Sequence, residues 1–217
     1  VLVVEDLGET LAERLARTLG GVERELYVIS PYFVPTSRGT GFFCSRAREG
    51  LRVAVLTNAL EATDVLAVHS GYAKRRHKLL RAGVKLYELR RQSPARRRWW
   101  RAQGFHGSSA SSLHAKTFSV DRRRLFIGSF NFDQRSVRLN TEMGFVIDSA
   151  EMATASADEF VQGVLANAYE VRLHGHRLEW VERNEGAEIV HRREPGSTLW
   201  QRLFIWIVGK LPIDWLL

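Results

Sequence analysis

The chain has 217 residues, of which 45% are hydrophobic and 26% are charged, values that suit one large α/β domain with a substantial core. The net charge of +8 favours an anionic partner, either a phospholipid surface or nucleic acid. The single cysteine, Cys44, excludes an internal disulfide framework, and no apolar run is long enough to span a bilayer. Because the chain begins with Val1 rather than Met and shows no signal peptide, we expect it to be part of a longer protein.

The first part of the chain alternates buried-type strands with helical patterns. An apolar run at 1–4 precedes a helix at 5–19, in which leucines recur every four residues until Gly20 and Gly21 end it. We then expect strands at 26–29, 51–56 and 84–89, with helices at 41–50 and 63–82 between them. The second helix should direct Val65 to the core, and its residues His69 and Arg76 would by themselves form a solvated basic face. This alternation is typical of an α/β sheet.

The predicted strand at 26–29 runs into a loop at 30–36 that contains two prolines and two aromatic residues. Such a loop is stiff, and open α/β sheets bind ligands at the carboxyl ends of their strands. We therefore interpret the loop, with Tyr32 in it, as a pocket wall, and the alternative is a simple turn.

The segment 90–112 interleaves six arginines with Trp99, Trp100 and Phe105. Guanidinium groups bind phosphates and indole rings lie at headgroup depth, so a phospholipid interface is the first interpretation. A solvated loop is the second and a site for single-stranded nucleic acid is the third. The segment leads directly into the strand that carries His114, which supports the first interpretation.

The second part of the chain begins with a strand at 112–121, a basic turn at 122–124 and a strand at 125–127, and we interpret the turn as a solvated hairpin tip. A strand at 142–148 and a long helix at 150–173 follow. From 194 the composition changes, and residues 199–217 are almost wholly apolar. A helix so apolar is either buried against another lobe or lies in a membrane interface, and we leave these two roles open.

Polar side chains gather around the strand at 112–121. His114 and Lys116 have the same parity, so both point to one face of the strand. An imidazole can attack phosphorus or move a proton near neutral pH, and an ammonium neutralises the phosphate oxygens. Ser129 and Asn131 add neutral donors for the same oxygens, and Glu142 can orient the imidazole as carboxylates do in catalytic triads.

The string His114-x-Lys116, Asp121, Gly128-Ser129-x-Asn131 and Glu142 resembles the signature of the phospholipase D superfamily. The resemblance implies an α/β fold, a mixed sheet flanked by helices, and phosphodiester chemistry through a phosphohistidine without metal or other cofactor. It assigns His114 as nucleophile or general acid, and places Lys116 and Asn131 on the phosphate. Asp121 belongs to the catalytic motif, where its role is mainly structural.

Nearly the whole chain is similar to bacterial cardiolipin synthases, beginning with Ser-Pro-Tyr-Phe-Val-Pro at 30–35. The resemblance implies a phosphatidyltransferase whose partners are phospholipids and an anionic membrane surface. It implies a peripheral location at the cytoplasmic face of a bacterial inner membrane. Residues 1–193 would form the catalytic lobe and 194–217 the membrane-interface or lobe-docking helix. Candidate pocket residues, for which a structural role is the alternative, are Tyr32, Asn58, Asp64 and His69.

The proposed chemistry needs two histidines, because an alkoxide leaves phosphorus poorly unless a second group protonates it. Only His114 among the seven histidines is followed by the motif. We expect the second one from a missing N-terminal lobe or from a second copy in a symmetric dimer. The alternatives are a dimeric phosphodiesterase or nuclease and an inactive lipid-binding half, and nucleic acid ranks last as a partner.

Overall fold

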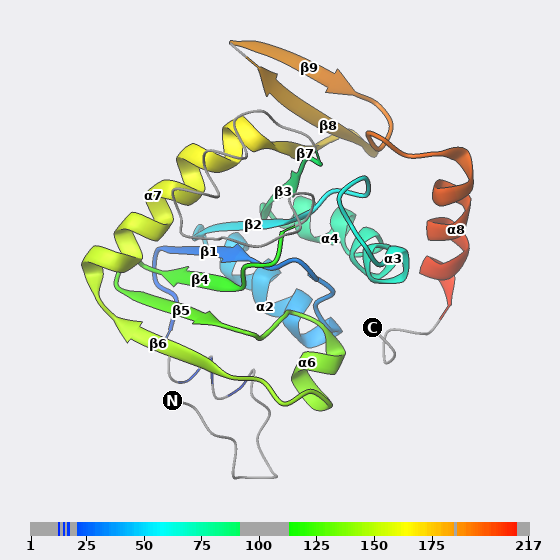
Figure 1. Cartoon of the computed structure of the whole chain (residues 1–217). Helices are drawn as coiled ribbons and strands as arrows, with labels where there is room; N and C mark the ends of the chain where they lie inside the picture. The colour runs from blue at the N-terminus through cyan, green and yellow to red at the C-terminus, as the bar shows by residue number, and fades with distance from the viewer. Residues whose placement is uncertain are drawn as a thin grey trace.

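The computed structural model describes residues 13, 15, 17, 21–91, 113–184 and 186–211. The described strands form one mixed sheet in the order β6-β5-β4-β1-β2-β3-β7-β8-β9 (Figure 1). The strands are β1 (Glu25–Ile29), β2 (Arg52–Asn58), β3 (Lys85–Leu89), β4 (Thr117–Val120), β5 (Arg124–Gly128), β6 (Gly144–Asp148), β7 (Ala168–His174), β8 (Arg177–Asn184) and β9 (Ala187–His191).

Strand direction decides which ends meet. β1, β2 and β3 are parallel, whereas β4 pairs antiparallel with β1, with Ile29 opposite Thr117. The carboxyl ends of β1 and β2 therefore lie beside the start of β4 and the end of β5. This edge of the sheet receives the loops that carry the predicted site.

Helices cover both faces of the sheet, so the predicted mixed sheet flanked by helices is confirmed (Figure 1). α2 (Ser37–Arg48), α3 (Leu66–Ala73) and α4 (Arg76–Arg81) pack on one face, where Phe43, Tyr72 and Leu79 join Val28 and Val55 in one cluster. α7 (Ala150–Asn167) covers the other face. The short α6 (Gln134–Arg138) joins β5 to β6, and α8 (Leu199–Lys210) follows β9.

Two predicted helices were wrong in extent. The helix expected at 63–82 is two helices, α3 and α4, and Val65 is exposed rather than directed to the core. The helix expected at 150–173 ends at Asn167, because the next residues form β7 between β3 and β8. The strands β7, β8 and β9 had not been predicted, and they extend the sheet by three.

The strand expected at 112–121 is regular only over Thr117–Val120, but the predicted alternation extends beyond it. Leu113 and Ala115 pack in the cluster beneath α7, whereas Phe118 and Val120 belong to the cluster on the opposite face. The even-numbered positions thus face away from α7, and His114 and Lys116 are among them.

A buried charged cluster joins α3, α4 and β3 to the segment before α8. Arg76 lies 3.1 Å from Glu88 and 2.5 Å from Glu194, and His69 Nε2 lies 2.6 Å from Glu194. Burial favours the neutral form of a carboxylate, but Arg76 and His69 lower the pKa of Glu194 far below its ordinary value. These contacts fit the structural role that the sequence had left open for His69, and a pocket role stays a prediction.

Several predicted features lie outside the described residues. They are the apolar run at 1–4, most of the helix at 5–19, the Arg- and Trp-rich stretch at 92–112 and the end of the apolar tail at 212–217. The first arginine of the basic segment is described. Arg90 is buried, bonds Glu182 and donates to the Ala166 carbonyl at 2.5 Å, so it serves the fold.

Candidate active site

His114 and Lys116 lie together just before β4. Lys116 Nζ is 3.5 Å from His114 Nε2 and donates to the His114 carbonyl at 3.1 Å. The imidazole is exposed, whereas the lysine side chain is almost wholly buried. The two side chains thus share one face and reach solvent through the histidine, which is the arrangement that attack on an incoming phosphate requires.

Burial controls the charge of Lys116. Loss of hydration lowers its pKa, and the carboxylates of Glu142 and Asp133 act in the opposite direction. A cation that has little hydration and no hydrogen bond to a carboxylate of the described residues keeps most of its field for a ligand. Lys116 is therefore prepared to bind an anion.

The turn after β5 is shaped by two glycines that are paired on the neighbouring strands β5 and β6. A Cβ on Gly128 would lie 2.5 Å from the Met143 carbonyl oxygen and 2.7 Å from the Phe126 ring. A Cβ on Gly144 would lie 2.4 Å from the same ring. Only glycines allow β5, β6 and Phe126 to pack this closely, and the packing sets the position of Ser129.

The Ser129 hydroxyl is bonded to Glu142. Ser129 Oγ donates to the Glu142 carboxylate and accepts from Met143 N at 2.9 Å, while Asn140 Nδ2 donates to Glu142 at 3.3 Å. Among the described residues no hydrogen bond joins Glu142 to His114. The structure thus brings Ser129 and Glu142 together, and orientation of His114 by Glu142 stays a prediction.

Asn131 is buried, and its Oδ1 has no hydrogen-bond partner among the described residues. A buried polar atom without a partner costs free energy, and such atoms in native structures commonly await a ligand or water. The loop around it is ordered by Asp133, whose carboxylate caps α6 by accepting from Ser136 N at 2.7 Å. Burial raises the pKa of Asp133.

The loop at 30–36 lies beside this turn, and its role as a pocket wall stays a prediction. Val34 N donates to the Phe132 carbonyl at 2.7 Å, which joins the two loops. Tyr32 donates to the carboxylate of Asp64 at 3.0 Å. Burial, followed by the bond to Asp64 and by the charges of Asp64 and Asp133, raises the pKa of Tyr32 to about 12. The phenol therefore remains a donor at physiological pH.

Asn58, at the end of β2, holds the backbone just before His114. Its Oδ1 accepts from Leu113 N at 2.8 Å, and its Nδ2 donates to the Leu113 carbonyl at 3.4 Å. The side chain is buried. This pairing replaces a strand partner where β4 is not yet regular, so Asn58 positions the backbone before His114, and its role as a pocket residue stays a prediction.

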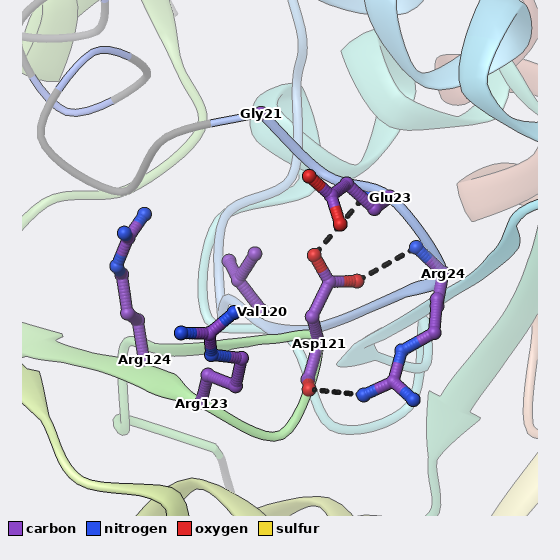
Figure 2. A pocket seen from close by; sticks show the side chains of 7 residues that line it. All are labelled: Gly21, Glu23, Arg24, Val120, Asp121, Arg123 and Arg124. Atoms are coloured by element: carbon purple, nitrogen blue, oxygen red, sulfur yellow. Dashed lines mark hydrogen bonds between the residues drawn. The ribbon is translucent and has the colours of Figure 1, made fainter.

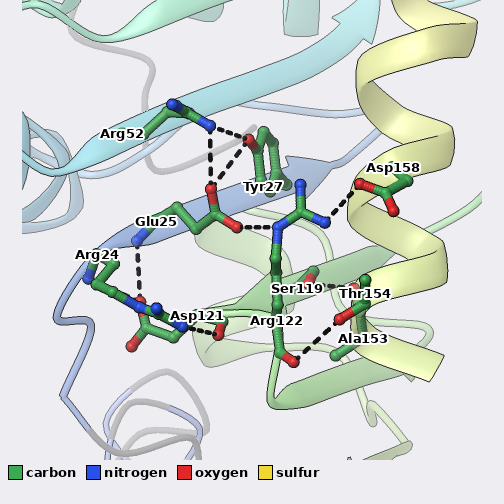
Figure 3. A network of polar contacts seen from close by, with 10 residues as sticks. All are labelled: Arg24, Glu25, Tyr27, Arg52, Ser119, Asp121, Arg122, Ala153, Thr154 and Asp158. Atoms are coloured by element: carbon green, nitrogen blue, oxygen red, sulfur yellow. Dashed lines mark hydrogen bonds and ion pairs between the residues drawn. The ribbon is translucent and has the colours of Figure 1, made fainter. Parts of the chain in front are cut away.

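Asp121 lies at the other end of β4, away from His114. Its carboxylate accepts from the backbone N–H groups of Glu23 and Arg24 (Figure 2) and of Glu25 (Figure 3) at 2.8–2.9 Å. Asp121, Glu23 and Arg24 also border a cavity of about 550 Å³. Asp121 thus fastens the start of β1 to the end of β4.

The turn after Asp121 adds ion pairs rather than a solvated tip. Arg122 has a φ of 55° and bonds both Glu25 and Asp158, each at 2.5 Å, so it links β1 to α7 (Figure 3). Its charge belongs to the fold, which corrects the expectation of a free basic hairpin tip at 122–124.

Comparison with known proteins identifies relatives. Over residues 15–163 the chain matches the family described as "Cardiolipin synthase, PLD-like domain". It is 44% identical over 211 residues to cardiolipin synthase C of Escherichia coli, an alignment that covers 95% of this chain and 44% of that protein. The chain thus spans less than half the length of this curated relative.

Two solved structures are similar in fold. A phosphatidylserine synthase from Haemophilus influenzae gives a TM-score of 0.55 at 14% identity, over 74% of this chain and 36% of that one. Nuc, a phospholipase D family member from Salmonella typhimurium, gives 0.53 at 15% identity, over 74% of this chain and 91% of that one. At identities this low, the two comparisons support a similar fold and no shared function.

Proposed function

Since this chain belongs to the phospholipase D-like family of cardiolipin synthases, we propose that it forms one half of a phosphatidyltransferase that joins two phospholipids into cardiolipin. The observation that carries the proposal is the exposed imidazole of His114 beside the buried ammonium of Lys116. The unpartnered Oδ1 of Asn131 adds a second polar group whose hydrogen bonding is incomplete in the free protein.

The reaction proceeds in two displacements. An imidazole nitrogen attacks phosphorus, and the bond from phosphorus to the leaving alkoxide breaks as a second histidine gives the alkoxide a proton. A hydroxyl of the acceptor lipid then attacks phosphorus and gives up its proton to that second histidine, while the phosphorus–nitrogen bond breaks and frees the imidazole. Lys116 neutralises the non-bridging oxygens throughout, and Ser129 and Asn131 orient them.

The second histidine comes from outside this half. Exposed apolar side chains border the site: Leu139, Met143 and Phe145 lie on the turn after α6 and on the edge strand β6, next to Glu142. Packing a second lobe against them would bury this surface and enclose the phosphate. An N-terminal lobe of the same protein is our first choice, and a second copy of this chain is the other.

The location follows from the substrates. Phospholipids with two acyl chains remain in a bilayer, so we infer that the protein works at a membrane as a peripheral protein, on the cytoplasmic face of a bacterial inner membrane. No helix among the described residues is long and apolar enough to cross a membrane.

The test is phosphatidyl transfer by the full-length protein with radiolabelled phospholipid, read as labelled cardiolipin and as label trapped on the protein. We expect His114→Asn to lower transfer by at least about a thousandfold. His174→Asn is the matched control, because His174 is exposed and far from the site in sequence. Unchanged turnover in His114→Asn would remove His114 from the chemistry and leave an inert lipid-binding half.

A further inference from the structure

Helix α8 exposes an apolar face that the fold leaves uncovered among the described residues. Trp200, Phe204, Ile207 and Leu211 follow one another at helical spacing, and Trp200 is 79% exposed. Leu199, Leu203 and Trp206 widen the same stripe. We propose that this face, which we call the α8 face, docks the protein on the surface of an anionic phospholipid bilayer.

The α8 face is opposite to the side by which the helix packs on the protein. Ile205 is buried, and a Cβ on Gly209 would lie 3.8 Å from the Ser70 carbonyl of α3. A capping box between Thr198 and Gln201 fixes the start of the helix. Figure 1 shows α8 beside α3 at one side of the molecule. The exposed residues are therefore displayed by a docked helix rather than by a loose tail.

The approach to the helix is also fixed. Glu194 lies in the buried cluster with Arg76 and His69, and Gly196 takes a φ of 64° against Glu61, where a Cβ would lie 2.5 Å from the carboxylate. These contacts set the direction in which residues 197 and 198 lead into α8. The α8 face thus has one orientation relative to the sheet.

Charge indicates what the face contacts. The exposed arginines Arg192 and Arg193 precede the helix, and Lys210 lies at its end with Nζ 3.7 Å from the centroid of the Trp206 ring. α8 contains no acidic residue, and the charge of Glu194 is neutralised by Arg76. Exposed indoles with neighbouring cations complement an anionic headgroup layer, where rings insert and cations meet phosphates.

The inference rests on the proposed function in one respect, since an enzyme acting on bilayer lipids must approach their surface. The competing occupant of the α8 face is a second protein surface, either another copy or another lobe. A second copy would be detected as a change in oligomeric state, a lobe of the same chain as vesicle binding that substitutions on the α8 face leave unchanged, and the bilayer as sedimentation with vesicles.

The experiment is co-sedimentation of the full-length protein with phosphatidylcholine vesicles that do or do not contain phosphatidylglycerol. The test variant is Trp200→Ser with Trp206→Ser. The matched control is Ile189→Ser with Val190→Ser, because these side chains are similarly exposed on β9. We expect the test variant to bind anionic vesicles at least about tenfold more weakly, and the control to bind like the unaltered protein.

Two further measurements separate the possible failures. Arg192→Gln with Arg193→Gln should lower binding to anionic vesicles about tenfold and leave neutral vesicles unaffected. Transfer measured in detergent micelles should be unchanged by the tryptophan substitutions. If the unaltered protein showed no transfer in micelles, the proposed function alone would be contradicted. The docking proposal would be overturned if the tryptophan variant bound vesicles as well as the control did. It would also be overturned if these substitutions dissociated a dimer without affecting vesicle binding.

Discussion

The two ends of β4 carry residues of one motif but are built in opposite ways. At the Asp121 end the carboxylate accepts three backbone N–H groups, and Arg122 bonds two carboxylates. At the His114 end the imidazole is exposed, and Asn131 Oδ1 has no partner among the described residues. The first end is satisfied in the free protein and stabilises it, whereas the second retains its capacity for a ligand. Stability and chemistry should therefore be separable by mutation.

The largest effect is expected at Lys116. Lys116→Met should lower turnover by about a thousandfold, because the charge that neutralises the phosphate is lost. The melting temperature should not fall, since the substitution removes a buried cation whose pKa is lowered by burial. Initial rates and thermal melts measure both, with the exposed Lys85→Met as control. A parallel fall in rate and melting temperature would contradict the separation.

Asp121 should show the reverse. Asp121→Ala removes three bonds to backbone donors and should lower the free energy of unfolding by about 3 kcal/mol. The rate per folded molecule should stay within about threefold. Urea unfolding and active-site titration check the two values, and the exposed Asp148→Ala is the control. A stable but inactive Asp121→Ala protein would place Asp121 in the chemistry.

Asn58 lies between these extremes, because it acts on the reacting group through the backbone of Leu113. Asn58→Ala should lower kcat about tenfold and leave KM nearly unchanged, since His114 loses its fixed position rather than its substrate contacts. Asn58→Asp keeps the acceptor for Leu113 N–H and should recover part of the rate. A variant that is destabilised but has normal kcat would show that Asn58 serves the fold only.

The smallest effect concerns pH. Activity should fall as pH rises through the pKa of Lys116, which lies below the ordinary 10.5. Because the unfolded chain holds this proton more tightly, the free energy of unfolding should rise with pH in that same window. Glu142→Gln removes a charge that supports the ammonium, so the alkaline limb of the rate profile should move to lower pH. A limb unmoved by Glu142→Gln would separate Glu142 from Lys116.

The sequence predicted the parts of the fold that depend on local pattern. β1, β2 and β3 were found from their buried-type runs, and the shared face of His114 and Lys116 followed from parity alone. The extent of α7 was not predictable in this way, because residues 168–173 are compatible with either a helix or a strand. Pairing with Leu86 and its neighbours on β3 decides for the strand.

Contacts between distant segments gave no local signal. The sequence suggested a solvated basic face for His69 and Arg76, and a pocket for His69, yet both side chains pair with Glu194, more than a hundred residues away. Ser129 and Glu142 likewise read as separate ligands for phosphate and imidazole, but the close approach of Gly128 and Gly144 brings them into contact. Such pairings depend on the assembled sheet.

The anchoring of Glu194 has a mechanical consequence. If an amphipathic helix is joined to its domain by a flexible linker, the domain can take a range of heights above the surface that the helix binds. Here the helix is clamped at its entry by Glu194 and along its length by α3. The height and tilt of His114 relative to a surface bound by the α8 face are thus set by the folded domain. An insertion or deletion near residue 197 would therefore change this height and tilt, and not merely the range over which the domain moves.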